Sequence, residues 1–499
     1  MTIRIRRLLP LAVLAALALA AAGCGGGGGN KGAAATPLGA SLVRSDALAF
    51  VSVNSDLSSS QWKTADTLSR KFPGRDKAIA QLKQSVSKQQ LDYNGDIKPA
   101  LGSEVDVAVV PGATLKDTSF AVLTKPSDAG KYKDLVAKLN ANDTSGKPAV
   151  YREISGGWYA LSSSQKMIDA VLKSGGSSLA DEGTFKDALD ALPTDTLATA
   201  YVNGKQLATV LQQYQQQSSS PFDLSAAGLN DLDFISASLS AESDGVRLRG
   251  AVSGSGAKTL GTGNYTSKLL DGVPGDALAF LSFQGGGAAD QLQKLESNPQ
   301  LGPALKQMEQ GLGISLPDIL DLLRNEVAFY VRPGTGIPEF SLLLQSSDEQ
   351  KSMSTLEKLF TRLGATGLTR PCSAAPEVGV DVKCVAVSNL QIRYGAFDGK
   401  VLVSTGPSAI SEYKASGNKL SDDADFKAAK AAAAMPDSNG GFLYVNLKDT
   451  IPLIESLAGL GGSVPSAELT ANLAPLRSLT AWGGGSGNTR TFDVFLEIK

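Results

Sequence analysis

Short segments in which apolar residues alternate with polar ones, or run together, recur along the chain and predict β-strands. The first spans 47–53, and the segments 104–110 and 120–124 follow on either side of a Pro111-Gly112 turn. A long hairpin pattern, 234–241 with 246–252, comes later. Because neighbouring strands of this kind join as hairpins, the pattern predicts a largely antiparallel sheet.

Between the strand segments, apolar residues recur every three or four positions, which predicts helices. The first helical region, 62–91, is interrupted at Pro73-Gly74, where a helix must break or kink. Further helices are expected at 128–139, 165–172, 185–192 and 206–214. Strands joined as hairpins with helices between them predict an α+β fold in which the helices pack on one face of the sheet.

The order of these elements occurs twice. The stretch 46–50 (Asp-Ala-Leu-Ala-Phe) returns letter for letter at 276–280. Collinear matches pair Glu104-Val105 with Glu326-Val327, Phe120 and Asp128 with Phe340 and Asp348, Leu179, Asp181, Phe185 and Lys186 with Leu420, Asp422, Phe426 and Lys427, and Tyr201-Val202-Asn203 with Tyr444-Val445-Asn446. Chance matches would not keep this order. We therefore predict two tandem duplicated lobes, 41–253 and 268–499, each a mainly antiparallel sheet with helices packed on it, and a linker at 254–267. Whether the lobes share one sheet stays open.

The second lobe carries an insertion that holds two of the three cysteines. The segment from Asp348 to Gly399 is longer than its counterpart from Asp128 to Gly157, and Cys372 and Cys384 lie inside it. In an exported protein two such thiols, close in sequence on either side of a turn-rich stretch, are expected to form a disulfide. The alternative is two free thiols.

The amino-terminal segment has the layout of a bacterial lipoprotein signal peptide, 1–23. Arg4, Arg6 and Arg7 precede an apolar stretch at 8–22 that is short for a transmembrane helix. Ala21-Ala22-Gly23-Cys24 resembles a lipobox, so Cys24 is the expected lipidation site; the alternative is an ordinary secretory signal with a chance cysteine. In the segment 24–40, five glycines follow Cys24, and this composition predicts a flexible tether.

A diacylglyceryl group on Cys24 would hold the protein on the outer face of the cytoplasmic membrane, or in the cell envelope generally. Two acyl chains give lasting attachment, where one chain gives only marginal binding. The expected partner is therefore the membrane, through the lipid anchor.

Composition excludes several classes of function. The 499-residue chain is 42% hydrophobic and 19% charged, with a formal net charge of −2 and no long basic run, so nucleic acid is not an expected partner. Histidine is absent, which removes the commonest general base and the commonest metal ligand. We predict no catalytic residues, no metal site and no cofactor.

Three motifs invite a chemical interpretation and receive a structural one. The stretch 254–259 (Gly-Ser-Gly-Ala-Lys-Thr) looks like a phosphate loop, but Ala257 separates the Gly and Lys, so we assign it to the linker. The glycines at 483–487 are interpreted as a turn between strands. The carboxylate pairs 181–182 and 422–423 precede repeated helices and are interpreted as caps; calcium binding or acid–base chemistry is the alternative.

The Asp-Ala-Leu-Ala-Phe strand, the Leu-x-Asp-x-x-x-Phe-Lys element and the Tyr-Val-Asn strand that follows Pro193 and Pro436 resemble the domain-of-unknown-function 3352 family. The resemblance covers most of 41–499 and implies a secreted or membrane-anchored actinobacterial protein, but it brings no active site.

The duplicated positions are apolar strand residues and helix caps, so we predict a non-catalytic protein that binds a ligand or partner, or has a structural role. Duplicated halves form a junction where pockets are common, and the ligand there could be a lipid, a peptidoglycan fragment or a protein. The alternative is an envelope hydrolase that uses Asp, Glu or Ser without histidine.

Overall fold

The computed structural model describes residues 35–499 except 113, 115–116, 144–147, 218–227, 261–262, 287–295, 297–301 and 461–465. The predicted signal peptide 1–23, the lipidation site Cys24 and most of the predicted tether therefore lie outside the described residues. The last residues of the predicted tether, Gly39 and Ala40, are buried in the short helix η1 (Leu38–Ser41). The other predicted domain boundaries stay predictions.

Among its described residues, the first lobe has eight strands with helices between them. Its strands are β1 (Ala49–Asn54), β2 (Glu104–Val110), β3 (Ser119–Thr124), β4 (Val150–Ile154), β5 (Trp158–Ser162), β6 (Ala198–Asn203), β7 (Phe234–Glu242) and β8 (Gly245–Ser253). Its helices are α3 (Ser60–Ser69), α4 (Arg75–Lys88), α5 (Lys98–Ala100), α6 (Ala129–Ala141), α7 (Gln165–Val171), α8 (Gly183–Asp190) and α9 (Gly204–Gln217), with short turns at η2 (Tyr93–Ile97), η5 (Leu179–Asp181) and η6 (Leu229–Asp231).

The second lobe repeats this order with two additional strands. Its strands are β10 (Ala279–Gln284), β11 (Glu326–Arg332), β12 (Glu339–Gln345), β13 (Arg370–Cys372), β14 (Lys383–Val387), β15 (Leu390–Phe397), β16 (Lys400–Ser404), β18 (Phe442–Asn446), β19 (Leu476–Ser486) and β20 (Thr489–Ile498). Its helices are α11 (Gly302–Leu312), α12 (Leu316–Leu323), α13 (Glu349–Ala365), α14 (Ala409–Lys414), α15 (Ala424–Ala432), α16 (Leu447–Leu460) and α17 (Ala467–Leu473), with η8 (Leu270–Gly272) and η9 (Leu420–Asp422). Between the lobes lie η7 (Ser255–Leu260) and β9 (Tyr265–Thr266), which pairs with β17 (Ser438–Asn439).

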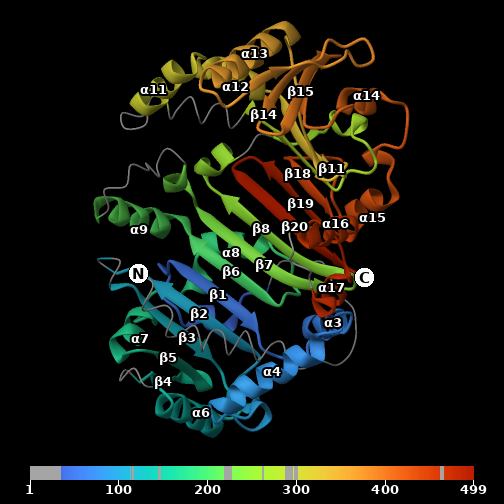
Figure 1. The fold of residues 1–499 in the computed structure, drawn as a ribbon. Helices are drawn as coiled ribbons and strands as arrows, with labels where there is room; N and C mark the ends of the chain where they lie inside the picture. The colour runs from blue at the N-terminus through green and yellow to red at the C-terminus, as the bar shows by residue number, and fades with distance from the viewer. Residues whose placement is uncertain are drawn as a thin grey trace.

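The two lobes share one continuous sheet, which answers the question that the sequence leaves open. Every strand pairing among the described residues is antiparallel, and β8 pairs with β20 from Gly245 opposite Glu497 to Ser253 opposite Thr489. Figure 1 shows these two strands side by side where the lobes meet. The strand order is β4-β5-β3-β2-β1-β6-β7-β8-β20-β19-β18-β10-β11-β12-β16-β15-β14-β13. The predicted duplicated α+β architecture is thus confirmed.

One face of the sheet, here called the covered face, carries the two main hydrophobic cores. In the first lobe α7 and α8 pack over Phe50 and Tyr201. In the second lobe α14 and α15 pack over their counterparts Phe280 and Tyr444. Both tyrosine rings are about 1% exposed, so the repeated Phe and Tyr positions are core residues in each lobe.

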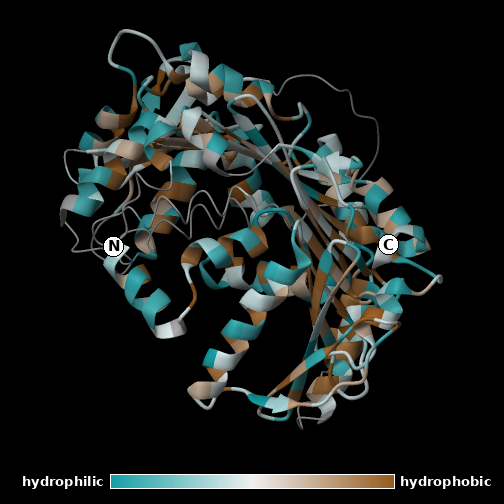
Figure 2. Cartoon of the chain, turned by 90° about the horizontal axis from the view of Figure 1, so that it is seen from above, coloured by the Kyte–Doolittle hydropathy of each residue, from teal (hydrophilic) through white to brown (hydrophobic). Residues whose placement is uncertain are grey.

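The opposite face, here called the open face, is covered by helices only in part. At the two ends of the sheet, α6 and α13 cover separate hydrophobic clusters, and α3 covers a third cluster near the centre. The expectation of helices on a single face is therefore wrong, and in the view of Figure 2 helices lie on both sides of the curved wall of strands. The physical reason is that strands such as β2 (Glu-Val-Asp-Val-Ala-Val-Val) carry apolar residues on both faces.

The turn predicted at 483–487 is confirmed only at its end and is wrong for the first three glycines. Gly483, Gly484 and Gly485 lie inside β19 and pair with residues of β20, while the turn itself is at Gly487, whose φ is +56°. Gly483 exchanges backbone hydrogen bonds with Gly440 and Gly441, which lie immediately before β18. Glycine here permits the close approach of backbone segments, in addition to the tight turn.

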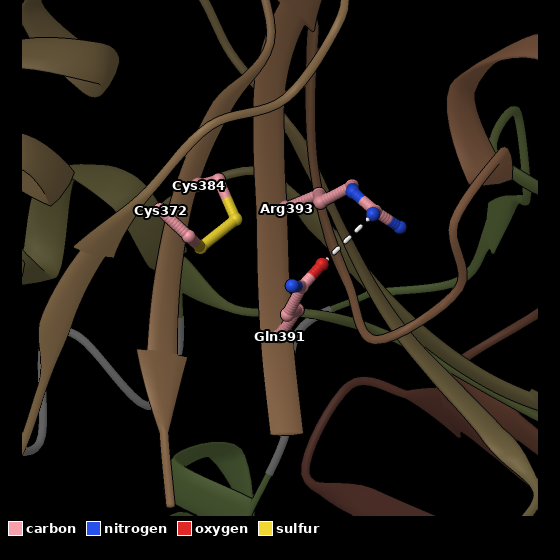
Figure 3. The surroundings of a disulfide bond; sticks show 4 residues. All are labelled: Cys372, Cys384, Gln391 and Arg393. Carbon is pink, nitrogen blue, oxygen red and sulfur yellow. Dashed lines mark hydrogen bonds between the residues drawn. A yellow bond between two sulfur atoms is a disulfide. The ribbon is translucent and has the colours of Figure 1, made fainter. Parts of the chain in front are cut away.

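The predicted disulfide is confirmed. Cys372 and Cys384 face each other directly in the antiparallel pair β13–β14, with their Cα atoms 5.0 Å apart. Figure 3 shows the bond beside β15, where Arg393 donates a hydrogen bond to Gln391. The bond therefore closes the pair of strands that the second lobe has and the first lobe lacks.

A buried ion network lies where the lobes meet. Arg247 of β8 is 4% exposed and donates hydrogen bonds to Asp493 of β20 and to the carbonyl groups of Ala432 and Ala433 at the end of α15. Arg249 donates a second hydrogen bond to Asp493, at 2.9 Å. Because Asp493 is only 2% exposed, its charge depends on these two guanidinium groups for solvation.

Candidate ligand-binding site

The break predicted at Pro73-Gly74 leaves a cavity between helices and sheet. The helix α3 ends at Ser69 and α4 begins at Arg75, so the two helices diverge over the open face. A cavity of about 530 Å³ lies beneath them, within the range of about 300–1,000 Å³ that is typical of small-molecule sites. Its lining residues are Ala65, Leu68, Ser69, Phe72, Arg75, Ala78, Ile79, Leu82, Leu197, Ala241, Val246 and Ile498.

The floor of this cavity is strand and its walls are helix. Leu197 immediately precedes β6, Ala241 and Val246 lie near the ends of β7 and β8, and Ile498 comes from β20 and thus from the second lobe. On α4, Ile79, Leu82 and Val86 are spaced by three and four residues and share one helix face. Val86 belongs to the core under α6, so the same apolar stripe lines the cavity and anchors the far end of α4.

Arg75 is the one charged residue in the lining. Its guanidinium forms an ion pair with Asp66 and donates a hydrogen bond of 2.9 Å to Ser69, both on α3. Burial alone would raise the pKa of Asp66, but hydrogen bonds from Arg70 and Arg75 lower it below its ordinary value. The arginine is therefore held in a fixed position at the cavity by a carboxylate that stays ionised.

The apolar surface continues from the cavity across the open face. One row of facing residues runs in register over seven strands: Leu239, Leu248, Val494, Ala481, Leu443, Leu281 and Phe329. Four of these side chains, those of Leu239, Leu248, Leu281 and Phe329, are 36–39% exposed. Apolar groups therefore remain accessible on both sides of the lobe junction.

A larger cavity, of about 620 Å³, has a mixed lining in which polar groups are as prominent as apolar ones. It lies wholly in the first lobe near the start of β2 and is lined by Ser55, Asp56, Leu57, Ser58, Asn94, Lys98, Pro99, Leu101, Gly102, Ser103 and Ser127. Water can form hydrogen bonds with hydroxyl and amide groups of this kind, whereas an apolar wall offers water no hydrogen-bond partner. The smaller apolar cavity is therefore the better candidate for a ligand site.

Two carboxylates converge in the first lobe, at a place that the sequence did not single out. Asp106 of β2 is fully buried, and neither of its oxygens has a hydrogen bond of ordinary geometry. Burial first, and the nearby charge of Glu104 second, raise the pKa of Asp106 well above its ordinary value. Buried acids of this kind occur in active sites. Neither Asp106 nor Glu104 lines the apolar cavity or the cavity of about 620 Å³.

The carboxylate pairs considered in the sequence have structural roles. Asp181 accepts hydrogen bonds from the backbone and hydroxyl of Ser178, and these bonds lower its pKa. Asp423 caps α15 through the N–H of Phe426, at 2.9 Å. Within the described ranges no three His, Cys, Asp or Glu side chains are grouped as metal ligands would be. The described ranges also contain no helix with the length and apolarity to cross a membrane.

None of the predicted site residues lines the apolar cavity, and one of them lies outside the described residues. Cys24 is not among the described residues, and the Cys372–Cys384 bond is at the outer edge of the second lobe. The cavity was missed because its lining comes from three strands, the residue before β6, two helices and the segment between those helices, which only the fold brings together. The one local signal was the apolar stripe on α4, whose spacing also suits an ordinary core helix.

Comparison with known proteins gives one family and weak structural similarity. A search of curated proteins finds no match. Two crystal structures of TP0453 are similar in part: crystal form IV has 14% identity over 45% of this chain and 77% of that chain with a TM-score of 0.25, and crystal form I has 14% identity over 47% and 79% with a TM-score of 0.24. These values carry no inference about this chain. The family described as "Protein of unknown function (DUF3352)" matches residues 8–155 and 159–498, and the chain therefore belongs to it.

Proposed function

We propose that this protein is a non-catalytic, lipid-anchored protein of the cell envelope that binds the acyl chain of a lipid. The observation that carries the proposal is the apolar cavity of about 530 Å³ between α3, α4 and the sheet. Apart from Arg75 and Ser69, its lining offers only aliphatic and aromatic side chains. Such a wall matches a hydrocarbon chain, because both surfaces lose contact with water when they meet. A peptidoglycan fragment is too polar for this wall.

The predicted anchor supports the same function. A diacylated Cys24 at the end of a short tether would keep the cavity within reach of membrane lipids. The exposed apolar row that starts at Leu239 and Leu248 adds a path along the open face toward the cavity. Location and site chemistry therefore point to one ligand class.

The alternative, a hydrolase without histidine, rests on Asp106 and Glu104. A hydrolase needs its acid beside a substrate and water. Asp106 instead lies in the packed core beside Gly39 and Trp158, and it does not line a cavity described here. The acyl-binding function is favoured for this reason.

Filling the cavity tests the proposal. Ile79→Trp places a large ring in the cavity from α4, while Ala80→Trp places the same ring on the exposed side of that helix. We expect the wild-type chain to bind cis-parinaric acid, a fluorescent fatty acid, and expect Ile79→Trp to weaken binding at least tenfold while Ala80→Trp leaves it unchanged. No saturable binding by the wild type, or equal binding by both variants, would contradict the proposal.

The anchor is tested separately. Cys24→Ala removes the only expected acylation site, so the protein should move from the membrane fraction to the soluble fraction and lose the mobility shift of a lipoprotein. A variant that stays membrane-bound with unchanged mobility would exclude the anchor without touching the cavity.

A further inference from the structure

A second cavity adjoins the apolar one and differs from it in chemistry. It has a volume of about 390 Å³ and lies between α4 of the first lobe and α17 of the second. Phe72, Arg75 and Ala78 line both cavities. The two spaces therefore meet along the first turn of α4.

The lining of the second cavity is polar and carries more positive than negative charge. Lys77 and Gln81 come from α4, and Glu468 and Asn472 come from α17. Together with Arg75, the lining holds two cations and one anion. The Lys77 ammonium group lies 2.7 Å from both carboxylate oxygens of Glu468, and these two side chains are 60% and 54% exposed. A pair this exposed is held weakly, and an anion can compete for Lys77.

Arg75 lies at the boundary of the two cavities and is fixed in place. Its side chain is 18% exposed and is paired with Asp66 on one side and with Asp76 on the other. A guanidinium has five N–H groups, so donors remain for a further acceptor. A guanidinium held in this way is suited to phosphate oxygens, which it binds with charge-assisted hydrogen bonds.

We infer that the ligand is an amphipathic lipid with a phosphate-bearing head. Its acyl chain occupies the apolar cavity, and its head occupies the second cavity against Arg75 and Lys77. This inference rests on the proposed acyl-binding function and adds the chemistry of the head. Because Asn472 of α17 accepts a hydrogen bond of 2.6 Å from the Gly74 N–H, the head would lie where the two lobes contact each other through their helices.

The test compares two lipids that differ only in the phosphate. Oleoyl lysophosphatidic acid and monooleoylglycerol are titrated against the full chain loaded with cis-parinaric acid, below their micelle concentrations. We expect the phosphate-bearing lipid to displace the probe on the order of a hundredfold more effectively, the effect of two charge-assisted contacts, from Arg75 and Lys77.

Three variants locate the head. Lys77→Gln should reduce the preference for the phosphate-bearing lipid by on the order of tenfold, the loss of one charge-assisted contact. Glu468→Gln should increase the preference, because it removes the carboxylate that competes for Lys77. Lys83→Gln, on the same helix but outside both cavities, should leave it unchanged. All three positions are exposed, so folding is not at risk.

The outcomes separate the two proposals. If the wild-type chain binds the probe but Lys77→Gln and Glu468→Gln leave the preference unchanged, the phosphate head is wrong and acyl binding stands. If neither lipid displaces the probe and the probe itself does not bind saturably, the proposed function fails and this inference fails with it.

Discussion

The two lobes differ most clearly at a pair of positions where the segment that precedes the first strand, here called the entry segment, packs against β2 in the first lobe or β11 in the second. In the second lobe Leu269 is fully buried and lies over Ala328 of β11. In the first lobe the equivalent residues are Gly39 and Asp106, and a Cβ atom on Gly39 would lie 1.9 Å from a carboxylate oxygen of Asp106. The large and small side chains have exchanged places, and the large one has become an acid.

A glutamate lies two residues before Asp106 and two residues before Ala328, and in both lobes it accepts hydrogen bonds from the entry segment. The number of these hydrogen bonds differs between the lobes. Glu326 is 1% exposed and accepts hydrogen bonds from the hydroxyls of Ser267 and Ser282 and from the N–H groups of Lys268 and Leu269. Glu104 accepts one such bond, from the Gly39 N–H at 2.9 Å. The glutamate carboxylate at this position has its hydrogen bonds satisfied in the second lobe, whereas in the first lobe it lies beside a second acid, the buried Asp106. Duplication keeps the backbone path while the polar interior diverges.

The largest expected effect distinguishes these two glutamates. Glu326→Ala takes the acceptor from two buried donors, the Ser282 hydroxyl and the Leu269 N–H, and from two partly exposed ones, and should lower the free energy of unfolding by about 4 kcal/mol. Glu104→Ala removes one acceptor from a half-buried site and should cost about 1 kcal/mol. Urea denaturation of both variants measures the difference, and equal costs would show that the lobes do not differ here.

The disulfide is the next largest contribution, and it exists in the second lobe alone. Its closed loop is short, so losing it should cost about 3 kcal/mol through the entropy of the unfolded chain. After reduction, hydrogen exchange should rise in β13 and β14 while β4 and β5 of the first lobe keep their protection. Thiol labelling of the unreduced native chain should find neither Cys372 nor Cys384 reactive.

Gly39 and Asp106 of the first lobe can be converted by mutation to the residues of the second lobe. Gly39→Leu alone forces a side chain against Asp106 and should cost about 2 kcal/mol. Combining it with Asp106→Ala reproduces the pair of the second lobe and should recover most of that loss. If the double variant is as unstable as the sum of the single variants, Gly39 and Asp106 are not packed as a unit.

The smallest effect is one of pH. The pKa of Asp106 is raised in the folded state, so the folded protein holds a proton that the unfolded chain releases. Its contribution to stability therefore falls as the pH rises from the ordinary aspartate value of about 3.9 toward the raised one. Asp106→Asn should flatten the dependence of melting temperature on pH across that window, whereas Asp134→Asn, at an exposed position on α6, should leave it unchanged. Parallel profiles for wild type and Asp106→Asn would contradict a protonated Asp106.

Much of the fold could be predicted from the sequence because its signals are local. Alternation located the strands, Pro73-Gly74 located the helix break, and collinear matches such as Tyr201 with Tyr444 located the repeat. The helices α3, α4 and α6 were predicted, but their place on the open face was not, because the apolar residues on both faces of β2 show that cover is needed but not which helix supplies it. Gly483 to Gly485 were assigned to a turn because glycine suits both turns and close backbone contacts.

The candidate site was harder to predict, because its parts are distant in the sequence. The cavity combines residues from Ala65 to Ile498, and no periodicity links α3 to β20. The acid at 106 could have been noticed by aligning the repeats, which places Asp106 against Ala328. Its compensation by Gly39 could not, because that residue reaches β2 only through the packing of η1.

The pairing of β8 with β20 has a consequence for symmetry. In the hairpin β7–β8, Ser236 faces Tyr201 and Ala251; in the hairpin β19–β20, Thr480 faces Tyr444 and Phe495. Because Tyr201 and Tyr444 are equivalent, Ala251 is equivalent to Phe495. Arg249 and Asp493, each two residues earlier, are therefore equivalent as well. They also face each other across the junction, which places them on the pseudo-dyad that relates the lobes. Any residue on a true two-fold axis faces its own copy, so a dimer of identical lobes would bring two arginines or two aspartates together there. Only an unequal pair of halves can place opposite charges on the axis, and each half is thereby matched to the other and mismatched to itself.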